Sequence, residues 1–71
     1  MRFSDYMKRV LQYKENTGQR LGQAMFNILD DNDRMLADMI RATNADPFYR
    51  NDLIPKFLSV LYDNGFITFD D

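Results

Sequence analysis

Apolar residues recur along most of the chain at the three- and four-residue spacing of one helix face. In the first segment they are Phe3, Tyr6, Met7, Val10 and Leu11, and mostly charged or polar residues stand between them. This spacing predicts a helix over residues 4–14, with Ser4 as its N-cap. The sequence Asn16-Thr17-Gly18 is expected to end the helix, because Asn and Gly readily adopt the left-handed conformation that closes one.

The same period predicts a second helix over residues 18–30, capped by Thr17. Its apolar face is formed by Leu21, Ala24, Met25, Ile28 and Leu29, and Phe26 widens that face. Gly22 lies inside this helix, where a glycine costs about 0.5–1 kcal/mol relative to alanine. We therefore expect another helix backbone to approach Gly22 closely.

A third helix is predicted over residues 33–42, with Met35, Leu36, Met39 and Ile40 facing inward. Methionines at such positions more often fill gaps in a small core than form an adaptable binding groove, and we expect the core role here. The acidic run before this helix does not match a calcium loop: counted from Asp31, the required Gly and Glu positions hold Leu36 and Ala42. We interpret the run as a junction in which Asp31 or Asn32 caps the helix.

The fourth helix is predicted over residues 52–63, after the turn chemistry of Thr43-Asn44-Ala45-Asp46-Pro47. Asn51 is its expected cap, and Phe57, Leu58 and Leu61 form its inner face. Asn64-Gly65 then ends it. The tail, residues 66–69, alternates loosely between apolar and polar and is expected to pack as an extended cover or to fray.

These patterns predict an all-α fold, a compact bundle of four short helices with an extended C-terminal tail. The 71 residues suffice for a single small domain, residues 1–71. A core of this size supplies only about 3–5 kcal/mol. Because the chain has no cysteine, disulfides cannot add to this, so we expect good helix packing or self-association as a homodimer to do so.

The composition argues against catalysis. The chain has neither cysteine nor histidine, and so lacks the usual ligands of zinc, haem and copper and the common catalytic bases and nucleophiles. Neither the G-x-x-x-x-G-K-[ST] nor the G-x-G-x-x-G phosphate-binding motif occurs. We expect a protein that is not an enzyme and has no cofactor or metal.

Charge is unevenly distributed along the chain. Residues 1–29 carry five bases and two acids, net +3, whereas residues 30–71 carry four bases and nine acids, net −5. The bases of the first part, Arg2, Lys8, Arg9, Lys14 and Arg20, raise an alternative function, a small nucleic-acid-associated regulator. The acidic pI of about 4.8 and the lack of a base-reading helix rich in Arg, Asn and Gln argue against it.

The hydrophobic runs are too short for a membrane span, which needs roughly 20 apolar residues. The start of the chain, Met1-Arg2-Phe3-Ser4-Asp5, also lacks the apolar stretch of a signal peptide. We therefore expect a cytoplasmic protein without membrane contact.

The aromatic pair Phe48-Tyr49 is the candidate for a contact with a protein partner. Phe48 precedes the cap of the fourth helix, a position from which an apolar side chain often packs under the first turns, so we interpret it as a structural plug. Tyr and Arg are enriched in interaction hot spots, which makes Tyr49 and Arg50 candidates for exposed contacts. The predicted surface joins Phe48, Tyr49 and Arg50 to Phe66 and Phe69 of the tail.

Two stretches of the sequence, GQRLGQAMFNIL and ADMIRATNADPFYRNDLIPKFLSVL, resemble a group of short, functionally uncharacterised proteins encoded in bacteriophage and bacterial genomes. The shared pattern is G-Q-x-x-G-Q-A-x-F-N-x-L, then A-x-x-I-R, then D-P-F-Y-x-x-x-x-I-P-x-F-L, and it covers residues 18–61. The resemblance carries no activity or functional residues. It implies an accessory factor that binds a host or viral protein in the host cytoplasm.

Overall fold

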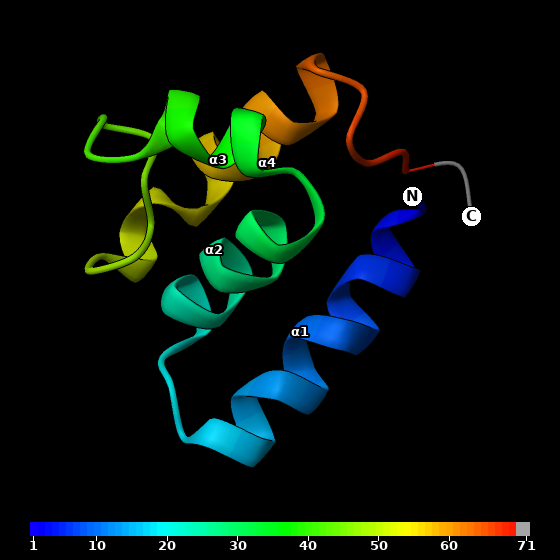
Figure 1. The fold of residues 1–71 in the computed structure, drawn as a ribbon, viewed down its shortest axis with the longest axis vertical. Helices are drawn as coiled ribbons and strands as arrows, with labels where there is room; N and C mark the ends of the chain where they lie inside the picture. The colour runs from blue at the N-terminus through cyan, green and yellow to red at the C-terminus, as the bar shows by residue number, and fades with distance from the viewer. Residues whose placement is uncertain (70–71) are drawn as a thin grey trace.

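Helix α2, Leu21–Asn32, lies at the centre of the molecule in the computed structural model, which describes residues 1–69. Helix α1, Phe3–Thr17, packs along one side of it, and α3, Arg34–Ile40, contacts it from another (Figure 1). A 3₁₀ turn, η1 (Asn51–Leu53), also contacts α2 and leads into α4, Ile54–Asp63. The predicted all-α bundle of four short helices is confirmed; residues 70–71 of the predicted domain lie outside the described part.

The core is built mainly on α2. Its buried side chains Ala24, Met25, Phe26 and Leu29 meet Tyr6 and Val10 of α1 and Phe57 and Leu61 of α4 in one apolar cluster. The Tyr6 hydroxyl donates a hydrogen bond of 2.6 Å to the Met25 carbonyl, which satisfies the polar end of this buried ring. Among residues 1–69, no helix is long and apolar enough to cross a membrane.

Helix α1 starts and ends differently from the prediction. Ser4 lies inside the helix, whose N-cap is Arg2 and has no side-chain cap. One of the N–H groups that an ordinary helix start leaves free, that of Phe3, instead donates to the Thr68 carbonyl of the tail at 2.8 Å. The helix continues to Thr17, and Gly18 closes it with the predicted left-handed conformation, φ 72°.

The start of α2 also lies later than predicted, at Leu21, and Thr17 does not cap it. The Thr17 hydroxyl instead donates to the Tyr13 carbonyl of the preceding helix at 2.7 Å. Another part of the backbone does approach Gly22 closely, as expected for a glycine inside a helix, but it belongs to a loop rather than to a helix. A Cβ at Gly22 would collide with the Pro47 carbonyl oxygen, and the Gly22 N–H donates to the Asn51 side chain at 2.9 Å.

Helix α3 differs most from the prediction. Its cap is Asp33, whose carboxylate accepts a hydrogen bond from the Leu36 N–H at 3.0 Å, rather than Asp31 or Asn32. Met35 and Met39 are not in the core; their side chains are 81% and 67% exposed. Leu36, Ala37 and Ile40 are the residues that α3 buries against α2.

Helix α4 is preceded by η1, so the predicted single helix over residues 52–63 is divided. Asn51 does not cap α4, because its side-chain oxygen accepts the Gly22 N–H bond. The predicted inner face is confirmed for Phe57 and Leu61, which are fully buried.

The C-terminal tail packs against the start of α1. Thr68 forms an isolated parallel bridge with Arg2, in which the Thr68 N–H donates to the Met1 carbonyl at 3.0 Å. Ile67 is buried beside this bridge. Of the two expectations for the tail, packing as an extended cover is the one observed for residues 66–69.

Candidate interaction site

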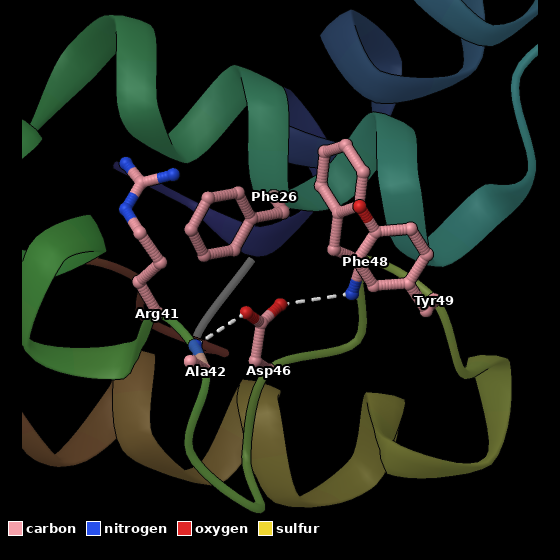
Figure 2. Close-up of a pocket in the computed structure, with 6 residues that line it drawn as sticks. All are labelled: Phe26, Arg41, Ala42, Asp46, Phe48 and Tyr49. Carbon is pink, nitrogen blue, oxygen red and sulfur yellow. Dashed lines mark hydrogen bonds between the residues drawn. The ribbon is translucent and has the colours of Figure 1, made fainter.

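A pocket of about 360 Å³ opens between α2 and the loop that follows α3. Its walls combine three aromatic rings with one basic and one acidic side chain: Phe26, Arg41, Ala42, Asp46, Phe48 and Tyr49. Figure 2 shows the Phe26 ring between Arg41 on one side and the Phe48–Tyr49 pair on the other.

Asp46 fixes the shape of the loop side of the pocket. One oxygen of its carboxylate accepts the Ala42 N–H at 2.8 Å, and the other accepts the Phe48 N–H at 2.9 Å (Figure 2). Ala42 has φ 62°, a left-handed conformation that few non-glycine residues adopt. The carboxylate therefore holds together a turn that the backbone alone would not favour.

Phe48 forms a wall of the pocket and packs on α2 rather than plugging the space under α4. Its ring meets the Phe26 ring edge to face, with the centroids 5.9 Å apart, and the side chain is only partly buried. The fully buried residue of this loop is its neighbour Pro47, which lies against Gly22. Phe48 thus packs against the core, as the interpretation as a structural plug expects, but it does so on α2 and with part of its side chain exposed.

Tyr49 is an exposed aromatic residue held in place from two sides. Its side chain is 79% exposed, and its ring centroid lies 4.8 Å from that of Phe48. The Arg20 guanidinium lies 6.0 Å from the Tyr49 ring centroid and donates a 2.7 Å hydrogen bond to the Phe48 carbonyl. Arg20, the residue just before α2, thus connects the start of that helix to the aromatic pair.

The charge of Arg41 is balanced within the domain. Its guanidinium lies 5.1 Å from the centroid of the Phe26 ring, within the range of a cation–π interaction. The same group lies 3.2 Å from the Asp38 carboxylate and 3.5 Å from that of Asp30. The pocket therefore offers a ligand mainly aromatic surface. Its two charged groups, Arg41 and Asp46, already have partners within the domain.

Arg50, the third candidate of this loop, does not line the pocket. It forms a two-pronged ion pair with Asp52, with contacts of 3.1 and 2.6 Å. This hydrogen bonding lowers the pKa of the Asp52 carboxyl and raises that of Arg50, and both groups are exposed. The charge of Arg50 is thus paired with that of Asp52 outside the pocket lining.

Phe66 and Phe69 belong to a different surface. Phe66 packs edge to face on Tyr6, with 5.7 Å between centroids, while Phe69 lies 5.1 Å from Phe3 and 5.4 Å from Tyr62. The tail, in red, and the loop before α4, in yellow-green, lie on opposite sides of the molecule in Figure 1. The structure thus separates the five predicted contact residues into two surfaces instead of one.

Four lining residues, Phe26, Arg41, Ala42 and Asp46, were not among the predicted contacts. Asp46 could have been found, because an Asp in a turn often accepts, through its side chain, the backbone N–H of the residue two positions later, which is an Asx turn. For the other three the sequence carries no such signal, since Phe26 reads as core and Arg41 as solvent-facing. Their meeting depends on how the loop folds back onto α2.

The part of the chain that the structure describes contains no group of three or more His, Cys, Asp or Glu side chains placed to hold a metal ion. No protein-family model, curated protein or solved structure matches this chain.

Proposed function

We propose that this domain is a non-enzymatic protein–protein interaction module that receives a partner at the pocket beside Tyr49. The observation that carries the proposal is an exposed tyrosine that is nevertheless fixed, by Phe48 at 4.8 Å and by Arg20 at 6.0 Å. Interaction hot spots are enriched in Tyr, and a side chain already held in place loses little conformational entropy on binding.

The chemistry of the walls supports an apolar group as the ligand of the pocket. Phe26, Phe48 and Tyr49 contribute aromatic surface, whereas Asp46 and Arg41 are engaged by backbone and carboxylate groups of this domain. A charged ligand group would have to displace these contacts. We therefore propose that the partner inserts an apolar side chain, aliphatic or aromatic, which Tyr49 covers.

The resemblance to bacteriophage-encoded proteins supports a partner in the bacterial cytoplasm, either a host or a viral protein. A second copy of this domain is another source of an inserted side chain and would give a homodimer.

Affinity purification from a bacterial lysate tests the proposal with three tagged proteins: wild type, Tyr49→Ala and Tyr62→Ala. Tyr62 is an exposed tyrosine outside the pocket, next to Phe69, and is the matched control. We expect a stoichiometric partner with wild type and Tyr62→Ala that is lost with Tyr49→Ala, while all three proteins melt at similar temperatures. Loss with Tyr62→Ala alone would move the contact to the tail surface. If wild type recovers no partner and sediments as a monomer, the proposal fails.

A further inference from the structure

A second uncovered apolar surface lies on α3. Met35 and Met39, one helical turn apart, are 81% and 67% exposed, and no residue of the described chain covers them. With Asp33, Leu36 and Asn64 they line a shallow groove of about 270 Å³. This groove shares no lining residue with the pocket beside Tyr49.

The charge around the groove is acidic. Asp33 is part of its wall, Asp38 is exposed on α3 between the two methionines in sequence, and Asp63 is exposed next to Asn64. The segment 30–41 together with Asp63 contains five acids and two bases. Both bases are already paired: Arg34 lies 3.7 Å from Asp30, and Arg41 lies 3.2 Å from Asp38. The surroundings therefore favour a positively charged partner.

We infer that the groove binds a basic amphipathic helix of a partner protein. Apolar side chains one turn apart on that helix would pack against Met35 and Met39, and its Lys or Arg residues would lie near Asp33 and Asp63. Methionine suits this role, because its unbranched, flexible side chain can repack around apolar groups of different shape. An amphipathic helix presents apolar anchors at the i, i+3 and i+4 spacing that such a groove accepts.

Helix α1 of a second copy is a poorer match. Its outer face carries one exposed large apolar side chain, Leu11, where the groove offers two methionines. Helix α1 carries three bases but also two acids, one of them Glu15 one turn after Leu11, so its net charge is only +1 against this acidic surface. The structure thus favours a separate basic helix over self-association at this groove.

The test uses the full chain labelled at the methionine methyl groups and followed by NMR. The probe is a peptide of about 18 residues with leucine at the i, i+3, i+4 and i+7 positions of one helix face and lysine on the other face, added at about 50 mM salt. A peptide with glutamate in place of every lysine is the control. We expect the lysine peptide to shift the methyl signals of Met35 and Met39, while those of Met7 and the buried Met25 stay in place.

Two variants make the result specific to the groove. Met35→Ser/Met39→Ser changes exposed side chains only, so the fold should survive, and the affinity for the lysine peptide should fall about tenfold or more. Tyr49→Ala should bind the peptide as wild type does, which separates this inference from the proposed function.

Three results with the peptides would overturn the inference. The lysine peptide leaves the Met35 and Met39 signals unmoved, the glutamate peptide binds equally well, or the double variant keeps wild-type affinity. A shift of the same two signals with protein concentration alone would assign the groove to a second copy, which also contradicts it.

Discussion

Gly22 illustrates how a single residue depends on a distant part of the chain. Alanine is the better helix former, yet a methyl group here would collide with the Pro47 carbonyl and lie 2.9 Å from the Asn51 side-chain oxygen. The Pro47 oxygen is backbone and cannot swing away. The glycine therefore allows the loop before α4 to lie directly on α2.

We expect Gly22→Ala to lower the free energy of unfolding by about 1–3 kcal/mol, because overpacking outweighs the gain in helix propensity. Thermal or urea unfolding measures the difference. Gln12→Ala, at an exposed position of α1, is the control and should change stability by no more than about 0.5 kcal/mol. A Gly22→Ala protein more stable than wild type would show that the loop does not press on α2.

Tyr6 is the titratable residue that the core affects most. Burial raises the pKa of its phenol above the ordinary value of about 10. Below that value the phenol is protonated in both folded and unfolded states and stabilises the fold in full. At higher pH the unfolded chain loses the proton while the folded chain keeps it, so ionisation favours unfolding.

We therefore expect the free energy of unfolding to fall with rising pH above about 10, by up to about 1.4 kcal/mol per pH unit from this group. Tyr6→Phe should remove that contribution and, through loss of the 2.6 Å bond to Met25, cost about 0.5–1.5 kcal/mol at pH 8. Urea unfolding between pH 8 and 11 measures both effects. Tyr62→Phe, at an exposed tyrosine, should keep the wild-type slope; an equal slope in Tyr6→Phe would contradict the prediction.

At the scale of an element, α3 has only seven residues and depends on its ends. A helix this short is not stable by itself in water. Its start is fixed by the Asp33 carboxylate, which accepts the Leu36 N–H, and its inner side by Leu36, Ala37 and Ile40. One N-cap hydrogen bond and one stripe of buried side chains therefore stabilise this helix.

We expect Asp33→Ala to cost about 0.5–2 kcal/mol, the usual effect of removing an N-cap. Asp31→Ala removes a nearby carboxylate that does not cap α3 and is the matched control, with a change within about 0.5 kcal/mol. Chemical unfolding of the two variants distinguishes them. An equal loss in both would mean that the general negative charge, and not the cap bond, stabilises this helix start.

At the scale of the whole molecule, the two ends of the described chain stabilise each other. The Phe3 N–H bonds to the Thr68 carbonyl and the Thr68 N–H to the Met1 carbonyl, while Ile67 fills the core beside them. Because these contacts join residues more than 60 positions apart, they form only in the folded chain.

Ile67→Ala should therefore lower the free energy of unfolding by about 2–5 kcal/mol, close to the whole stability of a domain this small. In wild type, hydrogen exchange should show the Phe3 and Thr68 amides protected along with the core. Thr68→Ala keeps the backbone bonds and is the control, with little change expected because its side chain is exposed. Rapid exchange of both amides in wild type would show that the tail does not pack as described.

Local sequence determined the helices and several of their ends. The 3.6-residue period located all four helices, and Gly18 closes the first as predicted, because both signals depend only on neighbours in the chain. The same period also correctly predicted that Phe57 and Leu61 lie in the core. For the candidate site the local sequence identified Phe48 and Tyr49 as an unusual pair, but not the α2 residue against which they pack.

Only the tertiary structure decided which side of α3 faces the core and which groups satisfy each helix start. Met35, Leu36, Met39 and Ile40 share one broad apolar face, and contact with α2 selects Leu36 and Ile40 while leaving the methionines in water. At the start of α1 the Thr68 carbonyl of the tail accepts the Phe3 N–H, and the Asn51 side-chain oxygen accepts the Gly22 N–H rather than capping α4. These choices depend on contacts between residues far apart in the chain, and the periodicity of one segment carries no information about its distant partners.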